Sequence, residues 1–173
     1  MSVALLSPPE LSRQLREDTS PDLKRRRAGI ALSFAGAAVA AAVAAYQTGL
    51  SKRLPDILPG PIWDAEKVDA SDYAYAHLQQ PDGPMMLVNY GLTAMALAAG
   101  GTNRATENPT LPVVAAAKAA ADFALCSAMA AEEWRDNRKL CSWCQVATGI
   151  SAVTLALTLP EAARALRGAQ PEA

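Results

Sequence analysis

Long apolar segments alternate with short polar ones along this chain. Four segments carry few charges and few turn-forming residues: 28–48, 84–100, 111–131 and 141–159. A membrane-spanning helix needs about 20 mainly apolar residues, with a range of about 17–25. The pattern therefore predicts an all-α fold, a bundle of four transmembrane helices in a lipid bilayer, whose second member is at the short end of that range.

The weak hydropathy of these segments leaves a soluble alternative open. Alanine dominates them rather than leucine or isoleucine, and the mean hydropathy is only +0.06. A soluble four-helix bundle with alanine-rich cores accounts for that value. A soluble amphipathic helix, however, has polar residues at every third or fourth position, whereas residues 28–47 contain no charge. Closely packed membrane helices also use small residues at their contacts, so the membrane interpretation is preferred.

The polar connections predict how the chain lies across the membrane. A tail of residues 1–27, with a short surface helix expected at 9–19, ends in the basic run 24–27. Because Lys and Arg mark cytoplasmic segments, both termini are expected in the cytoplasm. The membrane domain then covers 28–165 and the C-terminal tail 166–173.

The same orientation places two connections outside the cell membrane. These are the long first loop, 49–83, and a charged hairpin at 132–140. Within the loop, residues 64–78 are expected to form a short helix over the bundle. In a bacterium this side is the periplasm, so the expected location is the inner membrane, as a multi-pass protein.

Two cysteines separated by two residues, Cys141 and Cys144, form the clearest chemical motif. Thiols at this spacing can form and break a disulfide with little backbone movement. Cys141 is expected at a helix N-terminus, where free N–H groups favour a thiolate, and Arg138 and Lys139 precede it. The alternative is a pair of buried cysteines that only fill space.

Composition excludes several other functions. The net charge of −1 gives no basic field for nucleic acid. Three cysteines, an odd number, do not make a disulfide framework, and they fall short of the four ligands of a closed zinc site. No metal is therefore expected. The single histidine, His77, is interpreted as a solvated loop residue rather than a proton shuttle.

The chain resembles the vitamin K epoxide reductase family, specifically its small bacterial members with four core helices. Three stretches carry the resemblance: Leu-Cys-Ser-Trp-Cys-Gln at 140–145, the end of the long loop at 67–74, and the Gly-Pro turn into the second helix at 83–91. The likeness covers residues 28–165.

The resemblance implies a membrane thiol–quinone oxidoreductase built around a quinone pocket, with menaquinone or ubiquinone as the substrate. Cys141 and Cys144 are then the catalytic pair, with Cys144 next to the quinone. Thr148 stands where the family has a quinone-holding tyrosine, and it can still donate a hydrogen bond. In the family, a second cysteine pair in the first loop carries electrons from a thioredoxin-like partner, here expected in the periplasm.

The chain departs from this pattern in the loop. Residues 49–83 contain no cysteine, although the family's loop pair falls nearest to 63–67. The relay from a soluble partner is therefore absent or different. The alternative function is a non-catalytic membrane subunit or a quinone-binding scaffold that has lost the electron relay. The retained cysteine pair favours the enzyme, which is preferred.

Four further residues are candidates for the pocket or its surroundings. Lys118 and Asp122 share a helix face and can pair, since an ionisable group at mid-membrane costs about 2.5–3.5 kcal/mol and needs a partner. Asp122 is either a polar wall or proton source of the quinone pocket, or half of a structural ion pair. Cys126, on the same face, is expected to fill space, with a resolving thiol as the alternative. Trp143 is expected to anchor at the interface or pack against the quinone.

Overall fold

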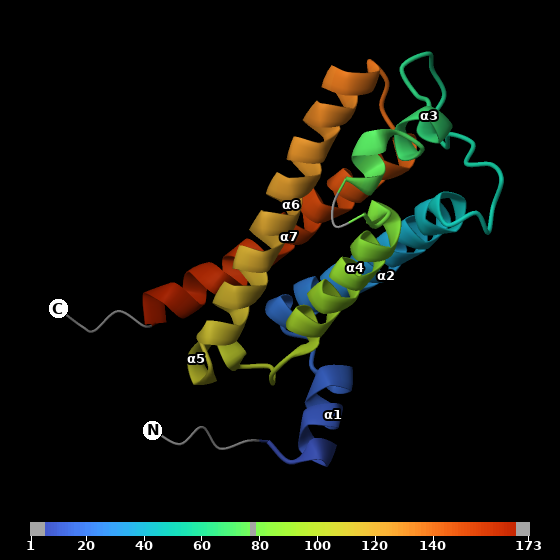
Figure 1. Ribbon diagram of the computed structural model, residues 1–173. Coiled ribbons are helices and arrows are strands. Elements are labelled where there is room, and N and C mark those ends of the chain that lie inside the picture. Colours follow the sequence, from blue (N-terminus) through green and yellow to red (C-terminus); the bar gives the residue numbers. More distant parts are fainter. Residues whose placement is uncertain (1–5, 77–78, 169–173) are drawn as a thin grey trace.

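The computed structural model describes residues 6–76 and 79–168, and all regular elements of this part are helices (Figure 1). The all-α prediction is confirmed for these residues. The elements are α1 (Pro8–Glu17), α2 (Pro21–Gln47), α3 (Ala65–Asp69), the 3₁₀ helix η1 (Asp72–Tyr75), α4 (Asp82–Ala98), α5 (Arg104–Glu107), α6 (Thr110–Asn137) and α7 (Ser142–Gly168). His77 lies outside the described residues.

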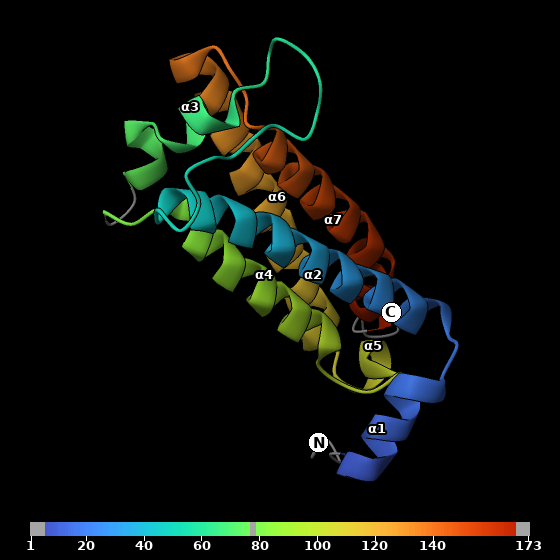
Figure 2. The ribbon, with the colours of Figure 1, turned by 90° about the vertical axis from the view of Figure 1, so that its right-hand side faces the viewer.

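Four long helices, α2, α4, α6 and α7, form the body of the molecule (Figure 1). α2 packs against α4 and α7, α6 packs along α7, and a smaller contact joins α4 to α6. Figure 2 shows α3 and the loop at one end of these helices, and α1 and α5 at the other. Two short elements, α3 and η1, therefore occupy the region where the sequence predicts one helix at 64–78.

Three of these helices are long and apolar enough to cross a membrane within the described part of the chain: α2, α6 and α7. α4, which corresponds to the second predicted span, has 17 residues and is not among them. α2 begins earlier than predicted, because Ser20 caps it by accepting a hydrogen bond from the Leu23 amide, and Pro21 follows the cap. The basic run 24–27 is therefore part of α2.

The predicted hairpin at 132–140 is wrong. α6 continues to Asn137, and only Arg138 to Cys141 separate it from α7. Arg138 ends the helix in the left-handed region, at φ 54°. The reason is Glu133, one of the acids within the predicted hairpin. Its side chain is buried and accepts a hydrogen bond from the Cys141 amide at 3.2 Å, so the helical turn is held against the start of α7.

Glycines let α4 lie close to α2. A Cβ on Gly36 of α2 would overlap the ring of Tyr90, and one on Gly83 of α4 would stand 2.7 Å from the Ala44 backbone nitrogen. The Tyr90 hydroxyl in turn donates to the Ala147 carbonyl of α7 at 3.0 Å. α2, α4 and α7 are thus joined at mid-bundle by close packing and one buried hydrogen bond.

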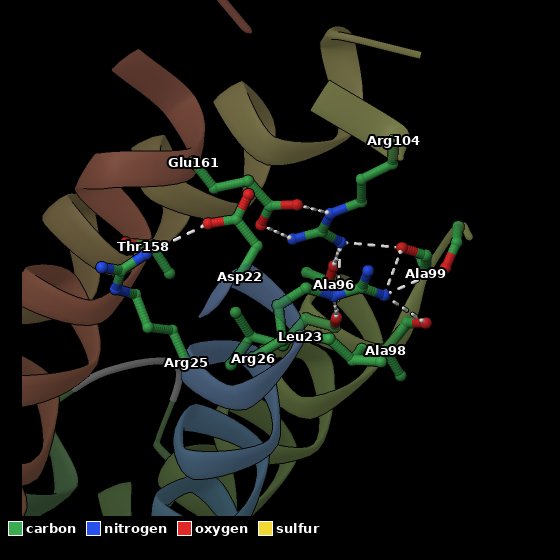
Figure 3. A network of polar contacts seen from close by, with 12 residues as sticks. Asp22, Leu23, Arg25, Arg26, Ala96, Ala98, Ala99, Arg104, Thr158 and Glu161 are labelled. Carbon is green, nitrogen blue, oxygen red and sulfur yellow. Dashed lines mark hydrogen bonds and ion pairs between the residues drawn. The ribbon is translucent and has the colours of Figure 1, made fainter. Parts of the chain in front are cut away.

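Two arginines close the end of the bundle where α4 finishes (Figure 3). The Arg26 guanidinium, from α2, donates to the carbonyls of residues 97–101 at 2.9–3.2 Å. Arg104 donates to the Ala99 carbonyl at 2.7 Å. The last carbonyls of a helix have no partner within it, so these cations satisfy them and oppose the negative end of the α4 dipole.

Glu161 of α7 balances this charge. Its carboxylate accepts hydrogen bonds from Nε and Nη2 of Arg104, at 2.9 and 2.8 Å (Figure 3). The two side chains are almost wholly buried. A buried ion pair is a weak source of stability, but removing one partner leaves an uncompensated charge. This contact could not be predicted from the sequence, because Arg104 lies in a polar connection 57 residues from Glu161.

We expect Glu161→Ala to destabilise the protein by about 3–5 kcal/mol, because Arg104 is left buried without a counter-charge. Thermal unfolding in detergent measures the effect. The matched control is Glu10→Ala, which removes the exposed pair with Arg13 and should cost less than about 1 kcal/mol. Equal, small effects of the two substitutions would contradict this role for the buried pair.

Candidate functional site

Asp56 ties the long loop to the N-terminus of α7. Its Oδ1 accepts hydrogen bonds from the Ser142 amide at 3.2 Å and from the Ser142 hydroxyl at 2.7 Å. Its Oδ2 accepts from the Ala65 amide, at the start of α3, at 3.0 Å. One carboxylate of the loop that follows α2 therefore bonds to the N-termini of both α7 and α3 and fixes the loop against them.

A short backbone pairing continues this contact. The Leu140 amide donates to the Ile62 carbonyl, and the Asp64 amide donates to the Leu140 carbonyl, both at 3.0 Å. The Trp143 indole donates to the Pro55 carbonyl at 3.0 Å. The loop thus lies across the segment that precedes Cys141, and the side chain of Cys141 is fully buried.

The two thiols lie at the first turn of α7, as the sequence predicts. Cys141 immediately precedes the helix, and its Sγ accepts a hydrogen bond from the Cys144 amide at 3.3 Å. Both cysteines are free thiols here. The contact with Cys144 lowers the pKa of the Cys141 thiol, but burial and the Asp69 carboxylate raise it more, so the net shift is upward. The thiolate that the sequence predicts at Cys141 is therefore disfavoured, although the two cysteines do lie together in one turn.

Two buried carboxyl groups flank the thiols. Asp69, at the end of α3, is 2% exposed, and its Oδ1 lies 3.9 Å from the Cys144 Sγ. Glu133 of α6 is 4% exposed and accepts from the Cys141 amide and, at 3.4 Å, from Gln145. Neither acid is recognisable as a site residue from the sequence alone. Asp69 stands in the 67–74 stretch that carries the family resemblance, and Glu133 was hidden in the supposed hairpin.

Burial changes the proton affinity of Asp69. Loss of solvent raises the pKa of its carboxyl to about 7, and the charges of Asp82 and Glu133 raise it further, while contacts with the two thiols oppose the shift. A carboxyl whose pKa lies near neutral pH can both take up and release a proton. The Asp69 carboxyl therefore has the proton affinity of an acid–base group, and it lies next to the sulfur of Cys144.

A cavity of about 240 Å³ opens between the four long helices beside Cys144. It is mainly apolar, with a few polar groups in its lining. The lining residues are Val43, Asp82, Met85, Met86, Asn89, Asp122, Leu125, Cys126, Met129, Glu133, Cys144, Ala147 and Thr148. A concave apolar space with a few polar groups is the usual form of a small-molecule site.

The structure brings three of the four predicted quinone contacts to this cavity. Cys144, Thr148 and Asp122 line it together. The hydroxyl of Thr148 donates to the Cys144 carbonyl at 2.9 Å. Trp143 is not in the set of described lining residues, because its indole turns to the loop and bonds to Pro55.

The pairing of Lys118 with Asp122 is confirmed, at 2.7 Å, and two residues of α4 complete it. Asn89 donates from its amide to Asp122 at 3.1 Å and accepts from Lys118 at 3.0 Å. The Thr93 hydroxyl donates to Asp122 at 2.9 Å. The ion pair therefore links α6 to α4 and fixes the amide of Asn89 at the cavity wall, a connection that helix periodicity within α6 cannot reveal.

Cys126 also lines the cavity, and its sulfur lies 3.8 Å from the Ser151 hydroxyl of α7. It shares the space with Cys144 without belonging to the capped turn that positions the other two thiols. The geometry gives it the contacts of a packing residue.

The sequence model of the vitamin K epoxide reductase family matches residues 28–159, which is most of the chain and includes both thiols and the whole cavity. The chain belongs to the vitamin K epoxide reductase family. No curated protein and no solved structure matches the chain at a significant level.

Family membership and the three apolar helices together identify a multi-pass membrane protein. The vitamin K epoxide reductase family consists of membrane oxidoreductases that act on quinones, so the resemblance seen in the sequence is confirmed at the level of the family. The thiol pair, the buried acids and the cavity all lie inside the matched segment.

The loop contact makes a direct prediction about Cys141. Asp56→Ala should raise the rate at which a maleimide alkylates Cys141 by about tenfold or more, since lost hydrogen bonds worth about 1–3 kcal/mol lower the free energy of opening. Site-resolved mass spectrometry of the reduced protein measures this rate. Asp72→Ala, an exposed acid of η1, is the control and should leave it unchanged. An unchanged rate in Asp56→Ala would show that the loop does not shield the thiol.

Proposed function

We propose that the protein is a thiol–quinone oxidoreductase of the bacterial inner membrane, in which Cys141 and Cys144 exchange electrons with menaquinone or ubiquinone. The observation that carries the proposal is the position of Cys144. Its thiol lies in the capped turn with Cys141, 3.9 Å from Asp69, and also lines the apolar cavity. The redox pair and the space for a quinone ring therefore meet at one sulfur.

The reaction balances within these groups and the quinone. The two S–H bonds break and one S–S bond forms between Cys141 and Cys144, which releases two electrons and two protons. The quinone takes up both electrons and both protons and becomes a hydroquinone. Asp69 is placed to accept the proton of Cys144, and Glu133, which lines the cavity, is placed to carry a proton toward the quinone oxygen.

The cavity wall supplies orientation. The amide of Asn89, held by Asp122 and Lys118, and the hydroxyl of Thr148 are the polar groups that the quinone oxygens can meet. Asp122 then acts by positioning Asn89, since a carboxylate offers no hydrogen bond to a carbonyl oxygen. The methionines and Leu125 provide the apolar surface for the ring.

The orientation proposed for the membrane follows from charge. The basic run 24–27 lies at the α1 and α5 end, so this end and both termini are cytoplasmic, and the thiols are periplasmic. α4 is the fourth span, short but packed along α2. An oxidised Cys141–Cys144 pair then passes its disulfide to a thioredoxin-like periplasmic protein, which must displace the loop to reach Cys141.

A quinone-binding scaffold is the second candidate. It is favoured by one observation: the loop over Cys141 contains no cysteine, and Ala65, buried in the same cluster as Cys141, offers no thiol to receive the disulfide. A scaffold of this kind binds the quinone without reducing it. Single-turnover kinetics separate the two functions.

Anaerobic, reduced protein in detergent should reduce one equivalent of a short-chain quinone. The loss of quinone absorbance measures this reaction. Cys141→Ser and Cys144→Ser should abolish the reaction, and Cys126→Ser should keep the stoichiometry. Asp69→Asn should slow it by about 10²-fold, the usual contribution of a general base, and Asp72→Asn should not. Quinone binding without reduction by the wild-type protein would identify a scaffold.

A further inference from the structure

Three metal-ligating atoms meet beside the cavity. The sulfurs of Cys141 and Cys144 and a carboxylate oxygen of Asp69 all lie within 4.8 Å of one another. Around a tetrahedral zinc ion, with bonds of about 2.3 Å to sulfur and about 2.0–2.2 Å to oxygen, such ligands stand roughly 3.5–3.8 Å apart. A small contraction of the three side chains brings them to that geometry.

Asp69 carries a second sign of a missing ligand. Its Oδ2 is buried and has no hydrogen-bond partner among the described residues. Buried polar atoms in folded proteins are nearly always paired, and each exception calls for a cause. The side chain is only 2% exposed, so bulk solvent does not reach this atom. An ion held between this carboxylate and the two sulfurs would supply the partner.

The three ligands are held from elements that are already fixed to one another. Asp69 ends α3, whereas Cys141 immediately precedes α7 and Cys144 lies in its first turn. Asp56 joins the starts of these two helices by hydrogen bonds to Ala65 and Ser142. The loop pairing at Leu140 adds a further link. The arrangement is thus built before an ion arrives, which reduces the ordering cost of binding.

We propose that the reduced protein binds one thiophilic divalent cation, Zn²⁺ or a close relative, through Cys141, Cys144 and Asp69. Cys144 and Glu133 both line the cavity, so a fourth ligand would come from that side. Water would complete the shell as in zinc sites with three protein ligands, or the Glu133 carboxylate would supply a fourth. Cysteine and histidine alone fall short of a zinc site in this sequence. The carboxylate that α3 brings to the two sulfurs becomes visible only in the fold.

Metal binding at this site would affect the redox state of the thiol pair. The ion needs both sulfurs as thiolates, so the metal-bound state and the Cys141–Cys144 disulfide exclude each other. Zinc therefore holds the pair reduced and closes it to exchange. Binding of the ion requires reduced thiols but no reaction with quinone, so the metal site and the oxidoreductase function can fail independently.

Cobalt titration of the reduced, full-length protein in detergent tests the site. We expect one Co²⁺ per chain with thiolate-to-cobalt charge-transfer absorption, displaced by Zn²⁺ and lost in the oxidised protein. Asp69→Asn should weaken Co²⁺ affinity by about tenfold or more, and Asp72→Asn should match the wild-type protein. An unchanged affinity in Asp69→Asn, or no charge-transfer band in the wild-type protein, would overturn the proposal.

X-ray absorption of the zinc-loaded wild-type protein keeps the test independent of whether Asp69→Asn folds. The proposal predicts two sulfur ligands, with oxygen ligands completing the shell. A shell of sulfur alone, which indicates ions shared between chains, or of oxygen and nitrogen alone would contradict it.

Discussion

The carboxylate of Asp56 is the contact on which the candidate site depends. It bonds to the first residue of α7 and to the first residue of α3, and these two helices carry Cys141, Cys144 and Asp69. Cys144 and Asp69 lie 75 residues apart in the sequence, and the contacts of Asp56 hold their two helices together. The burial of Cys141, the proton affinity of Asp69 and the position of Cys144 at the cavity all follow from one short set of hydrogen bonds.

The other end of the molecule meets a related physical demand in a different way. There, α4 finishes among apolar neighbours, and its free carbonyls receive the guanidinium groups of Arg26 and Arg104, with Glu161 as the counter-charge. Both ends of the bundle therefore use ionisable side chains to satisfy helix termini. At the α3 end, Asp56 and the buried Glu133 accept from amides at the start of α7, beside the two thiols, whereas at the α5 end the charges only close the fold.

Much of this arrangement could be predicted from the sequence. The apolar segments predicted the long helices, although α2 begins at Pro21, before its apolar segment, and the spacing of Lys118 and Asp122 predicted their ion pair. Contacts between distant segments could not be predicted, because periodicity within one helix says nothing about its neighbours. Asp69 and Glu133 look like ordinary loop acids in the sequence, and only the fold places them beside the thiols.

The central claim is that the pair Cys141 and Cys144, and no other thiol, supplies the electrons that reach a quinone. Peptide mapping of reduced protein after one anaerobic turnover with quinone tests this most directly. The account predicts a Cys141–Cys144 disulfide, with Cys126 recovered as a free thiol. A disulfide that includes Cys126, or three free thiols after the quinone has been reduced, would contradict it.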